Sequence, residues 1–160
     1  MINKALSCEL LAYFERCIAF YENFLQLETN KYQDVLNNLL SAIDGYVKEE
    51  QVYMLKAKGF EAERIRLLQQ TQMPEATFRE LIPLLDDSVR EEAMEHFESL
   101  SEILLKMKDV NQRCNELTEL KLKQIQNYLD TLEAENVQPQ IYTNQAQKKA
   151  GSYHMVSKKV

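Results

Sequence analysis

The sequence predicts an all-α protein, and three observations point to that class. Proline is absent from residues 1–73 and 84–138, so two long stretches can form helix without interruption. Runs of alternating β-branched residues, the usual signal for strands, are missing. Apolar residues instead recur at gaps of three and four, which places them on one face of a helix. Because such helices must cover their apolar faces, the sequence favours an elongated antiparallel bundle of three to four long helices with coiled-coil-like packing.

The first long stretch, about residues 7–72, is expected to be helical with one apolar face. That face carries Leu10, Tyr13, Cys17, Phe20, Phe24 and Leu27, then Leu36, Leu39, Ile43, Tyr46, Met54, Leu55, Ile65 and Leu68. An unbroken helix of this length would reach roughly 100 Å, which is longer than its partner helix could cover. We therefore expect a break near residues 37–45, at Asn37 and Asn38 or at Gly45, since glycine costs about 1 kcal/mol relative to alanine within a helix.

Residues 73–87 are expected to connect the two long helical stretches, because Pro74 and Pro83 interrupt any continuous helix there. One short helix fits between the prolines. Thr77, followed three residues later by Glu80, has the spacing of a capping box and predicts where that helix begins.

The second long stretch, about residues 88–135, is expected to form a helix of roughly 70 Å. Asp86, Asp87 and Ser88 are candidate N-caps at its start, and Ser88 with Glu91 has the spacing of a capping box. Its apolar stripe comprises Leu100, Leu104, Met107, Val110, Cys114, Leu117, Ile125, Tyr128, Leu129 and Leu132. With the first stretch and the connector, it defines a helical bundle domain over residues 1–135.

Residues 136–160 differ from the rest of the chain in charge and in apolar content. They hold four lysines and no acidic residue, whereas residues 1–135 hold 15 Lys and Arg against 25 Asp and Glu. Their apolar residues are too sparse to offset the roughly 1–2 kcal/mol of entropy lost per ordered residue, which predicts a flexible basic tail. Ile141 and Tyr142, which follow Pro139, are residues that could anchor the flexible tail on a partner protein. The alternative is a chain terminus without a binding role, in which the tyrosines have no specific function.

The composition argues against several classes of function. The acidic body repels phosphate backbones, so we expect no nucleic-acid binding. No apolar run approaches the roughly 20 residues that a membrane span needs, and the first residues lack the pattern of a secretory signal, so we expect no membrane insertion. The three cysteines are an odd number and are expected to be reduced thiols, which predicts a cytoplasmic protein.

No catalytic, metal or cofactor site is predicted, and we expect no enzymatic activity. Di-iron helical bundles use Glu-x-x-His pairs, but Ala93 stands three residues before His96, and His154 lies in the tail. Cys17 and Cys114 fall in the apolar stripes, where a small buried side chain is the ordinary interpretation. A row of acidic residues at helical spacing is expected to be a solvated charged face; it comprises Glu92, Glu95, Glu98 and Glu102.

Residues 47–68 mix acidic, basic and apolar side chains along one expected helix. Glu61 and Arg64, for example, stand three residues apart, where an ion pair contributes about 0.2–0.5 kcal/mol. A strip of ion pairs flanking the bundle is the interpretation that this pattern favours. A surface that binds a partner protein is the alternative.

The pattern of residues from Lys31 to Leu68 resembles that of the FlgN family of flagellar type III export chaperones. Members of that family show a Lys followed by an apolar pair, then a Glu-Gln about nineteen residues on, then a charged and apolar run that closes on Glu-x-x-Arg and leucines. These features fall here on Lys31, Val35–Leu36, Glu50–Gln51, Glu61–Arg64 and Leu67–Leu68. The connector, the second long helix and a short tail bearing a tyrosine match in the same order.

The resemblance implies a cytoplasmic export chaperone without a cofactor. Such a chaperone binds the C-terminal helical segments of the hook–filament junction (hook-associated) proteins, prevents their premature assembly and delivers them to the cytosolic domain of the export-gate protein. In the family, a tyrosine beyond the main helical region is associated with docking to that gate. Tyr142 matches this position best, and Tyr153 is the competing tyrosine.

An amphipathic client helix needs an apolar groove to bind, and we expect this groove on the C-terminal half of the second long helix, continuing into the tail. The residues expected to bind the client are Leu117, Ile125, Tyr128, Leu129, Leu132, Val137 and Ile141. A structural coiled-coil scaffold, or a homodimer without a client, is the alternative class of function.

Overall fold

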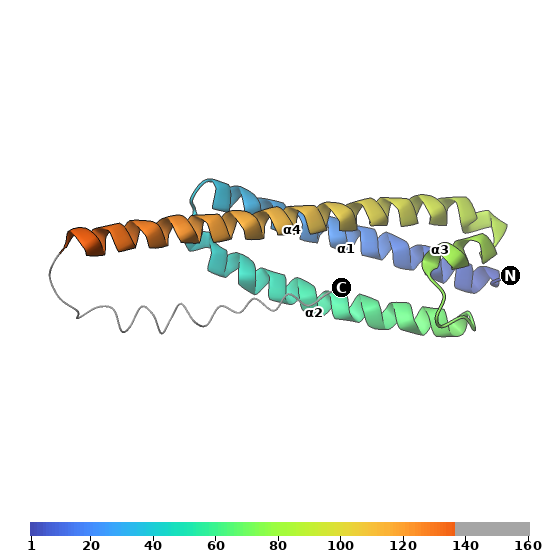
Figure 1. The fold of residues 1–160 in the computed structure, drawn as a ribbon. Coiled ribbons are helices and arrows are strands. Elements are labelled where there is room, and N and C mark those ends of the chain that lie inside the picture. Colours follow the sequence, from blue (N-terminus) through green and yellow to red (C-terminus); the bar gives the residue numbers. More distant parts are fainter. Residues whose placement is uncertain (137–160) are drawn as a thin grey trace. The chain divides into compact units, whose positions relative to one another are not determined.

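A computed structural model of the chain describes residues 1–136, which contain helices and turns and no strand. The elements in chain order are α1 (Lys4–Leu36), the 3-10 turn η1 (Leu40–Ala42), α2 (Ile43–Gln70), the short helix α3 (Phe78–Leu81), the 3-10 turn η2 (Ile82–Leu84) and α4 (Asp87–Glu135) (Figure 1). The chain divides into one unit of residues 1–120 and a second that begins at Lys121, within α4. The three long helices pack as a bundle, so the predicted all-α class is confirmed.

The first helical stretch is divided by a turn between α1 and α2. Asn38 adopts a left-handed backbone conformation, with φ of 60°, which asparagine tolerates better than most residues. Its N–H donates to the carbonyl of Val35 at 3.2 Å, and the N–H of Leu39 donates to the carbonyl of Asp34 at 2.8 Å. These bonds end α1 and reverse the chain, while Gly45 lies inside α2.

Helices α1 and α2 run antiparallel (Figure 1), and aromatic side chains lie between them. The ring of Tyr53 on α2 stacks on Phe24 of α1, with ring centroids 4.8 Å apart. The ring centroid of Phe60, also on α2, lies 4.9 Å from that of Phe20. The Tyr13 hydroxyl donates to the carbonyl of Phe60 at 3.2 Å. Aromatic pairs of this kind add about 0.5–1.5 kcal/mol each to the stability gained by burial, so they fix the register of the hairpin.

The apolar core of residues 1–120 draws on every helix of that unit. Phe14 of α1 is 1 % exposed. Its ring packs edge-on against that of Phe78, with ring centroids 4.8 Å apart. Leu67 of α2 and Ala93 of α4 are fully buried in the same cluster. Ile82, in the connector, is also buried there. Side chains of the connector therefore fill part of the core between the long helices.

Two capping expectations have different outcomes. The box at Thr77 and Glu80 is confirmed, because the Thr77 hydroxyl accepts from the Glu80 N–H while the Glu80 carboxylate accepts from the Thr77 N–H. The prediction of a capping box at Ser88 and Glu91 is wrong. Helix α4 begins at Asp87, and the carboxylate of Asp86 accepts from the N–H of Ser88 at 3.0 Å. Asp86 therefore accepts a hydrogen bond from the first turn of α4, and Ser88 lies inside the helix instead of capping it.

A cluster of three charged side chains is buried between α1 and α2. Lys31 lies between two carboxylates, 2.8 Å from Glu28 and also paired with Glu50 on the neighbouring helix. The side chains of Glu28, Lys31 and Glu50 are only 3 %, 12 % and 16 % exposed. With two carboxylates to one ammonium, the fully ionised cluster would carry an uncompensated buried negative charge.

Burial, with the neighbouring Glu50 carboxyl, raises the pKa of Glu28 to about 7 from its ordinary 4.5. For Lys31, burial favours the neutral amine, but contacts with Glu28 and Glu50 outweigh it and raise the pKa. Glu28 therefore holds a proton in the folded chain at pH values where the unfolded chain has lost it.

Between pH 4.5 and about 7 the folded state binds more protons at Glu28 than the unfolded state, so this residue makes stability fall as pH rises through that window. We predict that Glu28→Gln, which mimics the protonated acid, raises stability at pH 8 by about 1–3 kcal/mol and flattens its pH dependence. Urea unfolding from pH 5 to pH 8 measures both effects. Glu22→Gln, at an exposed site on the same helix, is the matched control. An equal response of the two variants would contradict the assignment.

Candidate functional site

The apolar stripe of α4 is largely buried up to Cys114, where Leu104, at 41 % exposed, is the exception, and it is more exposed after Cys114. Leu100, Ile103 and Cys114 are 8 %, 7 % and 2 % exposed and belong to the packed interior. On the same face of the helix, by the periodicity of 3.6 residues per turn, Tyr128 is 64 % exposed and Leu129 is 46 % exposed. A stripe of this kind normally lies against another element.

We define the α4 apolar face as Leu117, Leu122, Ile125, Tyr128, Leu129 and Leu132. Ile125 is 43 % exposed, whereas Leu117 and Leu132 are half-buried. Leu122, which is 59 % exposed, was not expected from the sequence. Its spacing, three residues before Ile125 and seven before Leu129, was the signal that could have found it. Of the other residues expected in this surface, Val137 and Ile141 lie outside the described residues, as do Tyr142 and Tyr153.

The opposite side of α4 carries other exposed leucines, so exposure alone does not define the face. Leu105 is 68 % exposed and Leu120 is 53 % exposed, but neither shares the arc of the α4 apolar face. The α4 apolar face differs because its members follow one another every turn. Burying one such side chain contributes about 1.5–3 kcal/mol, so a partner helix laid along several of them would gain enough to bind.

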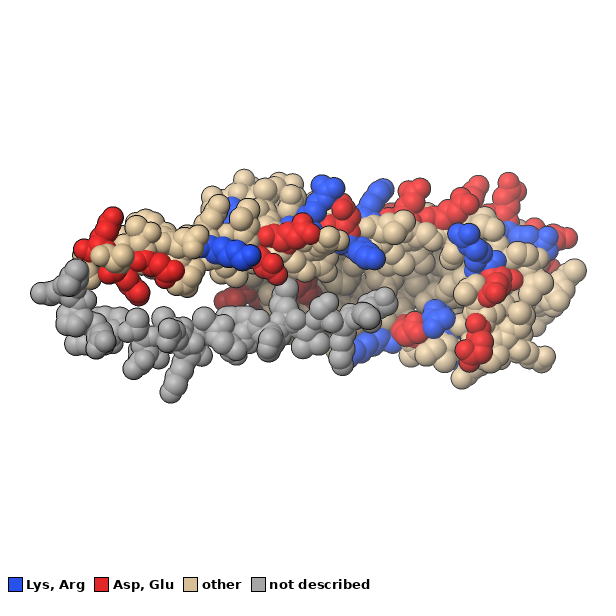
Figure 2. Space-filling model, in the orientation of Figure 1, with Lys and Arg blue, Asp and Glu red and all other residues tan. Residues whose placement is uncertain are grey.

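The first half of α4 carries the predicted acidic row on its outside. Glu92, Glu95, Glu98 and Glu102 are all exposed, and Figure 2 shows acidic side chains gathered over this part of the helix. The expected solvated charged face is confirmed for these residues.

One group of possible metal ligands forms within residues 1–136 by contact between helices. Glu15 of α1 and the pair Glu92 and His96 of α4 bring their ligand atoms within 4.8 Å of one another. The sequence could not show this, because Glu15 is distant in the chain. Both carboxylates are exposed, and the imidazole of His96 lies 3.8 Å from Glu15. A long contact between His96 and Glu15 brings these residues together, and nothing else at the cluster points to a metal ion.

Two of the three thiols are buried. Cys17 and Cys114 are 1 % and 2 % exposed, and burial raises the pKa of each. A raised pKa keeps a thiol protonated and therefore a poor nucleophile. Cys8 is exposed. These positions agree with the interpretation of Cys17 and Cys114 as small apolar side chains.

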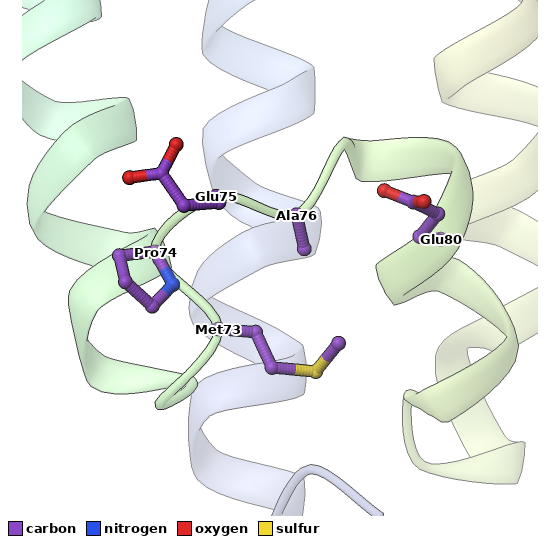
Figure 3. Close-up of a pocket in the computed structure, with 5 residues that line it drawn as sticks. All are labelled: Met73, Pro74, Glu75, Ala76 and Glu80. Carbon is purple, nitrogen blue, oxygen red and sulfur yellow. The ribbon is translucent and has the colours of Figure 1, made fainter.

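A shallow hollow lies in the connector after α2, lined by Met73, Pro74, Glu75, Ala76 and Glu80 (Figure 3). Its acidic member at α3, Glu80, already accepts hydrogen bonds from Thr77 in the capping box. The hollow therefore offers a ligand few polar groups that are not engaged. Within residues 1–136, no helix combines the length and the apolar character that crossing a bilayer requires.

A family model described as FlgN protein matches residues 1–150. Neither a curated protein nor a solved structure matches the chain.

Proposed function

The chain belongs to the FlgN family, and from that premise we propose that it binds the C-terminal helical segments of the hook–filament junction proteins. Membership confirms the resemblance seen in residues 31–68 and indicates a flagellar export chaperone. FlgN is a family of chaperones and not of enzymes. The proposal adds the identity of the clients, the surface that binds them and the place of delivery.

The observation that carries the proposal is the exposure of the α4 apolar face. Ile125, Tyr128 and Leu129 present apolar surface at successive turns, with exposed fractions between 43 % and 64 %. An amphipathic helix binds such a surface by laying its own apolar stripe along it. Tyr128 adds a rigid ring with a polar tip, the kind of side chain that concentrates binding energy.

Chaperoning follows from the same contact. The terminal segment of a junction protein is a helix that packs against copies of itself in the assembled polymer. While it lies on the α4 apolar face its stripe is covered, and it is unable to assemble. Covering a few hundred Å² of apolar surface at about 25 cal/mol per Å² exceeds the cost of ordering a short segment. Release requires only competition at the export gate, in the cytoplasm, without a cofactor.

We predict that Ile125→Asp combined with Leu129→Asp weakens client binding about 100-fold, because two apolar contacts of about 1.5 kcal/mol each are lost. Isothermal titration with the C-terminal segment of a junction protein encoded in the same genome measures the affinity. Both side chains are exposed, so circular dichroism should show an unchanged fold.

The matched control is Leu105→Asp combined with Leu120→Asp. It places the same two charges on exposed leucines of the same helix, on the opposite side. Client affinity should stay within about twofold of the unmodified chain. Equal losses in the two double variants, or no loss in either, would remove the α4 apolar face from the proposal.

Docking to the export gate is assigned to Tyr142, on the family pattern of a tyrosine beyond the helices. We predict that Tyr142→Ala leaves client affinity unchanged but weakens binding of the client complex to the cytosolic domain of the gate protein about tenfold or more, as loss of an aromatic anchor does. Tyr153→Ala is the control. If Tyr153→Ala alone weakens docking, the role belongs to Tyr153.

A further inference from the structure

The orientation of α2 is fixed by its aromatic side chains. Tyr53 and Phe60 point to α1, where Tyr53 stacks on Phe24 and Phe60 packs at a tilt against Phe20. Leu67, on the same side of the helix, is fully buried. The opposite side of α2 therefore faces away from the core of residues 1–120.

Between residues 47 and 58, that opposite side is apolar and basic. We define the α2 outer face as Val47, Lys48, Val52, Leu55 and Lys58, which share an arc of about 140° at 3.6 residues per turn. Val47, Val52 and Leu55 are 37 %, 53 % and 70 % exposed. Between residues 47 and 58 this arc holds no acidic residue. Exposed apolar side chains gathered in this way are typical of a surface that binds another protein.

The charges of α2 separate into paired and unpaired groups. Glu50 pairs with Lys31, Glu61 with Arg64, and Glu63 with Arg16. Arg66 pairs with Glu9. Part of residues 47–68 is therefore the predicted strip of ion pairs, and the expected contact of Glu61 with Arg64 is confirmed.

Lys48, Lys56 and Lys58 are exposed and form no ion pair within residues 1–136. Their positive charge stands out on a chain whose net charge is −6. An ammonium group without a partner next to exposed apolar side chains is complementary to a carboxylate that flanks an apolar stripe.

We propose that the α2 outer face is a second docking surface, which binds an amphipathic helix with acidic flanks from another protein. Such a helix would cover Val52 and Leu55 with its apolar stripe and place carboxylates on Lys48 and Lys58. The surface is separate from the α4 apolar face and does not depend on the function proposed for it.

Other occupants fit less well. Residues 137–160 contain four lysines and no acidic residue, so like charges would oppose their docking here. A second copy of the chain offers exposed apolar side chains on α4, such as Leu105 and Leu129, with acidic residues beside them. It is therefore an outcome of the test: dimers in sedimentation that Leu55→Ser combined with Lys58→Glu dissociates would overturn the proposal. An anionic membrane surface is usually recognised by clusters of about 4–8 basic residues, more than this face provides.

The test uses the full chain and a fluorescent synthetic helix whose leucine stripe is flanked by glutamates. Fluorescence anisotropy measures its affinity. We expect Leu55→Ser combined with Lys58→Glu to weaken binding by about tenfold or more. Leu105→Ser combined with Lys108→Glu is the matched control, because Leu105 is 68 % exposed against 70 % for Leu55 and both pairs have the same spacing. The control should change affinity by less than about twofold.

Three further arms separate the alternatives. A peptide with lysines in place of the glutamates should bind at least about tenfold more weakly, since its charges repel those of the face. Leu129→Asp removes apolar contacts that the leucine stripe could make on the α4 apolar face, so the binding that depends on Leu55 and Lys58 should persist in this variant. Vesicles containing phosphatidylserine should not bind the chain. Equal binding of the two peptides, equal loss in the two double variants, complete loss of peptide binding on Leu129→Asp, or binding to the vesicles in preference to the acidic peptide would each overturn the proposal.

Discussion

An apolar stripe on a helix has to be covered, and α4 meets this requirement along only part of its 49 residues. Its first half contributes Ala93 and Leu100 to the core that α1 and α2 complete. Past Cys114 the stripe continues without a change of period, yet Ile125, Tyr128 and Leu129 remain exposed. The same residue pattern therefore holds the fold together in one part of α4 and leaves apolar surface exposed in another, the part that we propose binds a client. A chaperone for helical segments needs both in one molecule.

The hairpin of α1 and α2 is specified by polar as well as apolar contacts. Lys31 and Glu50, which are part of the family motif, meet across the hairpin with Glu28 beside them. Their nineteen-residue separation in the sequence is thus the distance around the turn at Asn38. A buried charge cluster of this kind contributes little net stability, but it penalises a shifted register in which a charge would be left unpaired. The aromatic contacts of Tyr53 and Phe60 favour the same register.

Local features were predictable from the sequence, and contacts between distant residues were not. Proline placement and apolar periodicity gave the helical class, and the spacing of Thr77 and Glu80 gave a cap that forms. Of the three candidate caps before α4, Asp86 accepts a hydrogen bond from the N–H of Ser88, and the capping box expected at Ser88 and Glu91 does not form. The pairing of Glu28 with Lys31 and Glu50, and the approach of Glu15 to His96, depend on how the helices are aligned. The α4 apolar face was located by its period, but which part of the stripe stays exposed depends on how far the other helices cover it.

The account depends most on the claim that a client helix covers the exposed part of α4. Hydrogen exchange of the full chain, with and without a saturating junction-protein segment, tests this directly because amides under a bound helix exchange more slowly. The account predicts new protection within residues 117–135 and no change around Leu10 and Phe14 in the core. Protection confined to α1 and α2, with α4 exchanging as in the free chain, would contradict it.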